Sequence, residues 1–173
     1  HAKWEVNKYT VTFDANGGIL TETSKDVTFG ESYGDLPTPT YEGYKFVGWF
    51  DQPEGGTQYT KNTIVSITEA QPLYANWIPD SGVVYTVYHW QQNLDGNKED
   101  YDSNNYTLIN TQALTGTTNE EVTPDVEQYE GFTSPSTKTV KIKNDGSTTV
   151  NYYYTRNSYT LTVDKSTGIK TVT

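Results

Sequence analysis

The sequence predicts a mainly β protein (class α+β) built from two small tandem domains in an extended arrangement, with at most one short helix in each. The 173-residue chain contains 15 Tyr and 4 Trp against 5 Phe, and Tyr and Thr favour the pleated, half-buried surface of strands. A chain of this length fits two small domains that each bury a modest core. Internal similarity supports the same division.

Strands that begin with Tyr-Thr recur at a nearly constant spacing. The segment NKYTVTFD at residues 7–14 reappears as NSYTLTVD at residues 157–164, and VYTVYH at residues 84–89 is a looser copy. Their tyrosines, Tyr9, Tyr85 and Tyr159, lie 76 and 74 residues apart, which is the length of one small domain.

The ends of these units recur as well, since AKW at residues 2–4 resembles ANW at residues 75–77. Pro, Asp, Ser and Gly at residues 79–82 mark a short linker. An alternative for His1 is a remnant of a purification tag. We therefore divide the chain into the tail of a preceding repeat (1–6), a first domain (7–79), a second domain (80–156) and the start of a following repeat (157–173).

In the first domain, residues 9–13 alternate apolar and Thr side chains, which predicts a strand with one buried face. Asn16, Gly17 and Gly18 follow it and supply the positive φ angles of a tight hairpin turn. The two prolines in residues 36–40 exclude a central strand and predict an extended connector over the core. Further strands are predicted over residues 45–50 and 72–77.

In the second domain, residues 139–143 and 148–154 flank the turn sequence NDGS, which predicts a hairpin. Residues 120–128 are acidic and polar, and Pro124 interrupts them, so any helix there is short.

Four sequence blocks of the first domain resemble the Listeria-Bacteroides repeat, the internalin B-repeat-like domain. They are YTVTFDANGG at residues 9–18, YGDLPTPT at 33–40, EGYKFVGWF at 42–50 and LYANW at 73–77. The resemblance implies a β-grasp-like fold, repeats in a surface protein of Gram-positive or gut bacteria, and no catalytic residues. Pro72 departs from the pattern, ahead of the last strand.

The second domain is similar in layout to the repeats of mucin-binding surface proteins, with shorter and more degenerate blocks. The resemblance rests on YTVY at residues 85–88, NLDGN at 93–97, LTGT at 114–117, YEGF at 129–132 and VNYYY at 150–154. It implies another β-grasp-like module and a glycan or mucin partner.

Composition and charge exclude several classes of function. The formal net charge of −10 repels nucleic acid and anionic membranes, and no apolar run is long enough for membrane insertion. Without cysteine, the chain has neither disulfides nor thiol nucleophiles. We expect a monomer that holds no cofactor and no metal.

Catalysis has few candidate residues. His89 lies between Tyr88 and Trp90 in a regular strand alternation, where a packed or surface side chain is more common than a base. Carboxylate pairs of a glycosidase are a remote alternative, because most acidic residues fall in turn-rich segments. We therefore predict that the chain is not an enzyme.

Three other chemistries remain alternatives. The acidic loop 95–102 crowds oxygen ligands but does not match the EF-hand pattern, so a solvated loop is favoured over calcium. Lys141, Lys143, Asn151 and Glu130 are chemically suited to an isopeptide cross-link, although the lysines should face solvent. Most aromatic side chains should fill the cores, and Trp90 and Tyr153 are the candidates for ligand-facing aromatics.

The motifs predict non-catalytic stalk or spacer repeats. The family resemblances imply that these repeats belong to an extracellular, cell-wall-attached bacterial surface protein, in which they project or assist an adhesin. The neighbours of each repeat in the same chain are its expected partners. The alternative is an adhesive module that binds host glycans, mucin or a surface protein. Small repeats joined by short linkers favour the spacer.

Overall fold

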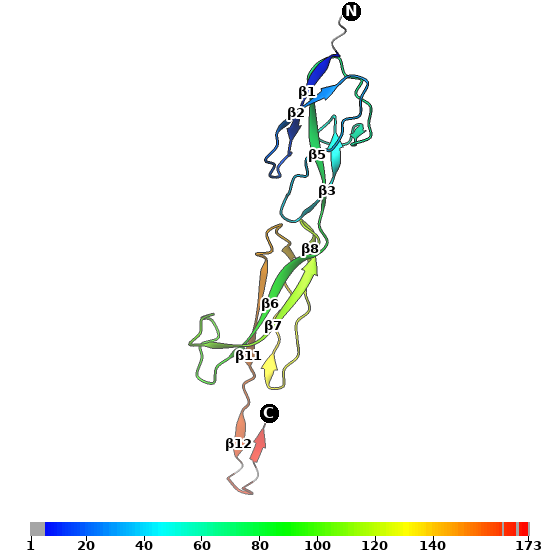
Figure 1. The fold of residues 1–173 in the computed structure, drawn as a ribbon. Coiled ribbons are helices and arrows are strands. Elements are labelled where there is room, and N and C mark those ends of the chain that lie inside the picture. Colours follow the sequence, from blue (N-terminus) through cyan, green and yellow to red (C-terminus); the bar gives the residue numbers. More distant parts are fainter. Residues whose placement is uncertain (1–5, 164, 169, 173) are drawn as a thin grey trace, which may run out of the picture. The chain divides into compact units, whose positions relative to one another are not determined.

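A computed structural model describes residues 6–163, 165–168 and 170–172 of the chain. The described residues form strands and no helix (Figure 1), so none of them forms a membrane-spanning helix. The mainly β prediction is therefore confirmed, whereas the β-grasp-like label stays a prediction. Residues 1–5, the predicted tail of a preceding repeat, lie outside the described residues.

The chain divides into two compact units. The first runs to Val83 and includes residues 117–119 and 143–146, and the second holds the remainder. The strands of the first unit are β1 (Lys8–Asp14), β2 (Ser24–Thr28), β3 (Tyr44–Phe50), β4 (Gln58–Tyr59) and β5 (Gln71–Pro79).

The first unit is built on one mixed sheet with the strand order β2-β1-β5-β3-β4. The first and last strands, β1 and β5, are parallel neighbours in the middle of this sheet, and the other pairs are antiparallel. One face carries the buried core, which contains Val11, Phe13, Trp49 and Leu73. The alternation of β1 predicts this face, since Val11 and Phe13 are buried whereas Thr10 and Thr12 are exposed.

The connector of the first unit agrees with the sequence, and the turn after β1 agrees with it in part. Asn16 and Gly17 have φ angles of 48° and 95°, in the left-handed region that Asn and Gly tolerate best. The loop between β1 and β2 is longer than a tight hairpin turn, because β2 starts only at Ser24. The proline connector covers the core, where Trp49 Nε1 donates a 2.8 Å hydrogen bond to the carbonyl of Pro37.

The second unit contains a four-stranded sheet with the order β7-β6-β11-β9 and a small β10-β8 pair. Its first and last long strands, β6 and β11, again run parallel as neighbours. The strands are β6 (Val83–Gln92), β7 (Tyr106–Gly116), β8 (Glu121–Val122), β9 (Phe132–Thr133), β10 (Val140–Lys141) and β11 (Thr149–Arg156).

After the second sheet, β12 (Leu161–Val163) and β13 (Lys170–Val172) pair as an antiparallel hairpin. The sequence predicts the start of a following repeat here.

One local prediction for the second domain differs from the structure. The hairpin over residues 139–154 is wrong, because β10 pairs with β8 while β11 pairs with β6 and β9. The turn itself is present, with Gly146 at a φ of 71°. The segment 120–128 holds β8 and no helix.

Candidate functional site

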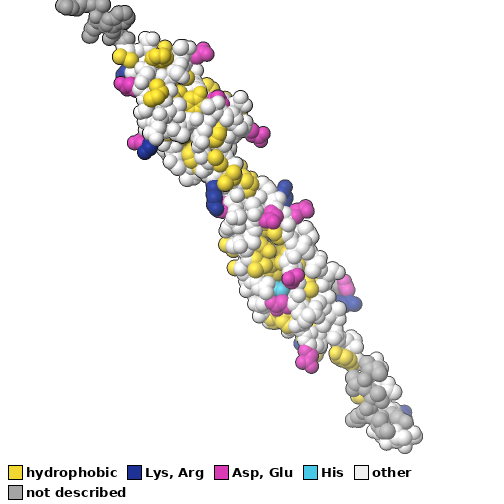
Figure 2. Space-filling model, turned by 90° about the vertical axis from the view of Figure 1, so that its right-hand side faces the viewer, with side chains coloured by type: hydrophobic (Ala, Val, Ile, Leu, Met, Phe, Trp, Pro, Cys, Tyr) yellow, Lys and Arg dark blue, Asp and Glu magenta, His cyan; other side chains and the backbone are white. Residues whose placement is uncertain are grey.

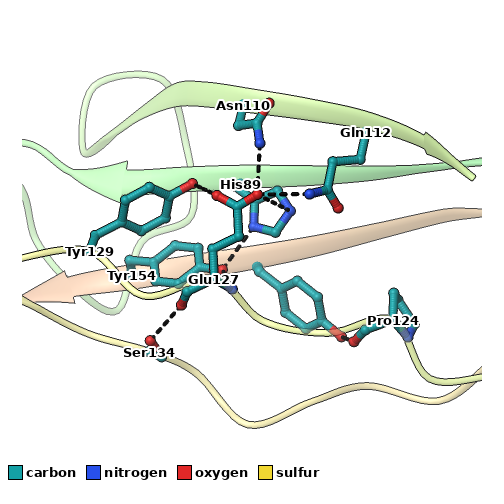
Figure 3. Close-up of polar contacts among 9 residues, drawn as sticks. His89, Asn110, Gln112, Pro124, Glu127, Tyr129, Ser134 and Tyr154 are labelled. Atoms are coloured by element: carbon teal, nitrogen blue, oxygen red, sulfur yellow. Dashed lines mark hydrogen bonds and ion pairs between the residues drawn. The ribbon is translucent and has the colours of Figure 1, made fainter.

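A buried histidine lies within a polar cluster of the second unit (Figure 3). The alternation of β6 turns His89 inward, and its side chain is fully buried. Its Nδ1 lies 2.8 Å from the hydroxyl of Tyr154 on β11. That hydroxyl also accepts a 2.8 Å hydrogen bond from the backbone N–H of Glu127, so its own proton can go to Nδ1. The ring proton of a neutral His89 then lies on Nε2.

The carboxylate of Glu127 closes the cluster on the other side of the ring. Its Oε1 lies 3.9 Å from His89 Nε2, which has no hydrogen-bond partner. The same oxygen accepts hydrogen bonds of 2.8 Å from Asn110 and 2.7 Å from Gln112, both on β7. The hydroxyl of Tyr129 donates to Oε2. Burial raises the pKa of Tyr129, and the hydrogen bond to Glu127 and its charge raise it further.

This arrangement is suited to holding the chain in place. A general base must reach a substrate proton, but the imidazole of His89 is fully buried. The hydroxyl of Ser134 donates to the backbone carbonyl of Glu127 at 2.8 Å. The hydroxyl of Tyr152 donates to the backbone carbonyl of Pro124 at 2.6 Å. These bonds fix the irregular segment between β8 and β9 against the sheet. His89 is thus packed, one of the two placements that its alternation favours.

The structure brings Trp90 and Tyr153, the two predicted ligand-facing residues, together on the opposite face of the sheet. They are direct partners in the parallel register of β6 and β11. Their ring centroids lie 6.0 Å apart, and the ring planes differ by 20°. Trp90 Nε1 donates a 2.9 Å hydrogen bond to the side chain of Asn151. Both aromatic residues are half-buried.

Three neighbouring side chains lie around the ring of Tyr153. The ring of Tyr101 lies 4.4 Å from that of Tyr153, and Tyr106 meets Tyr153 edge-on at 5.0 Å. Lys138 Nζ lies 5.9 Å from the centroid of the Tyr153 ring. Burial raises the pKa of Tyr153. Much of the surface of the Tyr153 ring, on which a sugar would stack, is therefore in contact with other side chains of the protein.

Tyr101 is the open member of the aromatic group, with 61% of its surface exposed. Sequence reasoning missed it, because it lies in a polar acidic loop with no strand alternation around it. The ligand-facing role of Trp90 and Tyr153 stays a prediction.

The acidic loop is held by its own hydrogen bonds. Asp102 Oδ1 accepts the backbone N–H groups of Asn104 and Asn105, and Asp100 accepts from the Asn97 side chain at 2.7 Å. Within the described residues, no group of three or more His, Cys, Asp or Glu side chains is placed to hold a metal ion. Acidic side chains are dispersed over the face seen in Figure 2.

The first unit has an open hollow of about 550 Å³ beside β1 and β5, whose lining includes Phe13, Asp14 and Tyr74. Asp14 is the charged residue of this lining, and its carboxylate accepts the backbone N–H of Asn16 at 2.8 Å. This carboxylate therefore helps to form the turn after β1. The hollow lacks the convergent polar groups that typically orient a small ligand.

Comparison with known proteins identifies the first unit. Residues 9–76 match the sequence model of the Listeria-Bacteroides repeat domain, so this prediction is confirmed for the first domain. The resemblance of the second domain to mucin-binding repeats is not shown by these comparisons.

Three curated relatives share parts of the sequence. The chain is 34% identical over 103 residues, 60% of its length, to a protein of Evansella cellulosilytica provisionally named a membrane protein. It is 36% identical over 77 residues, 44% of its length, to a provisionally named Gly-rich membrane protein of the same organism. It is 37% identical over 59 residues, 34% of its length, to Internalin H of Listeria monocytogenes. The chain spans 14%, 9% and 10% of these relatives, respectively.

Proposed function

We propose that this chain is a non-catalytic pair of spacer repeats from a bacterial cell-surface protein, which carries another part of that protein away from the cell. The observation that carries the proposal is the parallel pairing of the first and last strands in the main sheet of each unit, β1 with β5 and β6 with β11. Because neighbouring parallel strands point the same way, the chain enters a unit at one end of the sheet and leaves it at the other. Each unit therefore adds its own length to the chain's path.

The internal cores and the sequence relationships support this function. The first unit has its own buried core, and the second buries Val87, Val150, Tyr152 and Tyr154 on its own sheet. Repeats with separate cores can follow one another along a chain, because each one folds around its own buried residues. The match to the Listeria-Bacteroides repeat, and the similarity to Internalin H and to two proteins provisionally named membrane proteins, favour a surface protein.

Small-angle X-ray scattering of the chain tests the spacer function. A single compact body of 173 residues would have a radius of gyration of about 16 Å. The ten-residue strand β6 alone is about 33 Å long, so two units in series should give about 20 Å or more. A radius of gyration near that of one compact body would contradict the spacer.

A second candidate function is weak capture of a host glycan or protein. It is favoured by the exposed ring of Tyr101 lying against Tyr153, since exposed aromatic rings can stack on sugars. The test is binding of the chain to mucin and to a glycan array, with Tyr101→Ala as the variant that should lose the signal. Absence of binding in both assays would exclude this candidate.

A further inference from the structure

The first and last long strands of each unit form a parallel hydrogen-bonded ladder. In the first unit, Val11 to Asp14 on β1 face Gln71 to Tyr74 on β5. In the second, Val87 to Gln91 on β6 face Val150 to Tyr154 on β11, and Thr86 faces Thr149. The chain enters and leaves each of these two sheets through the two strands of its ladder.

This geometry determines how a pull on the chain ends loads the sheet. Tension draws the two parallel strands in opposite directions along their own axes. The ladder bonds run across the strands, so the pull shears them and loads them together. In an antiparallel terminal pair, the same pull would open the bonds one after another. The parallel arrangement therefore requires several bonds to break in a single event.

We propose that these two ladders are tension clamps, which keep each unit folded while the chain is pulled from its ends. This inference rests on the proposed spacer function, because a spacer that carries an attached partner transmits any force on that partner. It adds a mechanical role to each unit.

Further hydrogen bonds and one pair of stacked rings reinforce the ladder of the second unit. Arg156, at the end of β11, donates a 2.9 Å hydrogen bond through its backbone N–H to the side-chain carbonyl of Gln92. Its Nε donates another, also of 2.9 Å, to the backbone carbonyl of Gln92. At the opposite end, the backbone N–H of Thr86 donates to the carbonyl of Thr148 at 3.0 Å. Tyr153 and Trp90 stack across the ladder between these ends.

The ladder of the first unit is weaker. It has four residue pairs against six in the second unit. One of the four contains Pro72, paired with Thr12, and proline has no N–H to donate to a ladder. The side-chain carbonyl of Gln71 accepts a 2.7 Å hydrogen bond from the hydroxyl of Tyr33, which ties this strand end to a neighbouring loop. The first unit should therefore unfold at a lower force than the second.

Single-molecule force spectroscopy tests the clamp by changing the direction of pull. The chain has no cysteine, so introduced cysteines give unique attachment points. Pulling from the two chain ends shears the β1–β5 ladder. Pulling from Asn7→Cys and Phe29→Cys instead peels apart the antiparallel β1–β2 pair, because the backbone N–H of Phe29 donates to the carbonyl of Asn7.

We expect the first unit to unfold at a severalfold higher force when pulled from the ends than when pulled from residues 7 and 29, at the same speed. Forced unfolding is governed by the unfolding rate, and shear requires several bonds to break at once. Equal forces in the two directions would overturn the clamp.

A pair of matched variants tests the second unit. Arg156→Ala removes the Nε bond at the end of the ladder, whereas Lys141→Ala removes the same charge from an exposed position on β10, outside the ladder. The first variant should lower the unfolding force of the second unit, and the second should leave it unchanged. Equal effects of the two variants would contradict the assignment.

The scattering and pulling experiments separate the two proposals. An extended chain whose units unfold at the same force in both directions would overturn the clamp and leave the spacer standing. A compact chain with a strong dependence on the direction of pull would contradict the spacer alone, because it supports the clamp in each unit.

Discussion

At the scale of single residues, the hydroxyl of Tyr154 connects the sheet of the second unit to the segment that covers it. It lies at hydrogen-bond distance from the ring of His89 and accepts from the backbone of Glu127. Both partners come from other parts of the chain, so one oxygen atom joins β11, β6 and the segment after β8. Buried polar groups of this kind cost free energy once their partner is lost.

We predict that Tyr154→Phe lowers the free energy of unfolding by about 2 kcal/mol, because it leaves His89 Nδ1 and the Glu127 N–H without this partner. Urea unfolding followed by circular dichroism measures the change. Tyr159→Phe makes the same chemical change at a tyrosine that is 63% exposed, and should alter stability by at most about 0.5 kcal/mol. Similar effects of the two variants would show that the cluster contributes little.

The residues of this cluster could be predicted only in part from the sequence. The alternation of β6 places His89 among the packed or surface strand positions, and burial is one of these outcomes. Its partner Glu127 lies in an acidic, proline-containing stretch that is typical of a solvated loop. Only the fold brings that stretch over the histidine. A strand histidine turned toward a core needs polar partners, but the sequence does not show which residues they are.

At the scale of elements, the loop between β1 and β2 packs closely on β5. A Cβ atom at Gly18 would lie 2.6 Å from the ring of Trp77 and 2.7 Å from the backbone carbonyl oxygen of Thr40. That carbonyl already accepts the N–H of Ile19 at 2.7 Å. Trp77 in turn donates from Nε1 to the carbonyl of Ala15 at 3.0 Å, so neither neighbour can move freely.

We expect Gly18→Ala to destabilise the first unit by about 1 to 3 kcal/mol, the usual cost of overpacking. Gly82→Ala is the matched control, because the nearest atom to its Cβ is a carboxylate oxygen of Asp80 at 3.6 Å. Its effect should stay within about 0.5 kcal/mol. Tryptophan fluorescence during urea unfolding reports both variants, and a neutral Gly18→Ala would indicate that the loop can shift away from β5.

Elements with a regular local pattern could be predicted, and those fixed by distant pairing could not. The strands β1, β3 and β5 fall where the sequence blocks of the first domain predict them. The sequence of β7 shows little of the alternation that predicts a strand. Its residues Asn110 and Gln112 turn toward the polar cluster, while Leu108 and Leu114 are exposed. Its polar and apolar residues therefore do not follow the usual pattern of a half-buried strand.

The incorrect hairpin has a related cause. The turn signal between β10 and β11 is local, whereas β11 finds its partner in β6, some sixty residues earlier. Turn residues predict that the chain bends, but the choice of pairing depends on the whole sheet.

At the scale of the whole molecule, tyrosines link stability to alkaline pH. Burial raises the pKa of Tyr33 to about 12, helped by the nearby Tyr59. Five further tyrosines have raised pKa values with burial as the largest cause, and all five belong to the second unit: Tyr85, Tyr106, Tyr129, Tyr153 and Tyr154.

We predict that the tyrosines leave stability unchanged between about pH 7 and pH 9 and lower it above about pH 10, where unfolded tyrosine loses its proton. Above that pH the unfolded chain binds fewer protons than the folded chain, so the free energy of unfolding decreases with pH. The stabilisation from each tyrosine is present below its unfolded pKa and is lost as the pH rises through its folded pKa.

Urea unfolding at a series of pH values, with tyrosinate absorbance recorded in parallel, measures this dependence. The second unit should lose stability first, because it holds most of the shifted tyrosines. Trp90→Phe removes the tryptophan of the second unit and leaves Trp49 and Trp77 in the first unit, together with Trp4 near the start of the chain. Constant stability up to pH 12 would contradict the prediction.

The parallel pairing of the terminal strands also determines when a unit can fold. Val11 meets Gln71, and Thr86 meets Thr149, so each ladder joins residues about sixty positions apart in the chain. Contacts so distant in sequence form late and slow the folding of a domain. Whether the chain emerges from a ribosome or from a secretion channel, β1 cannot find its central partner until β5 has followed it out. Each unit should therefore remain unfolded, and able to pass through a narrow channel, until nearly all of its residues have emerged.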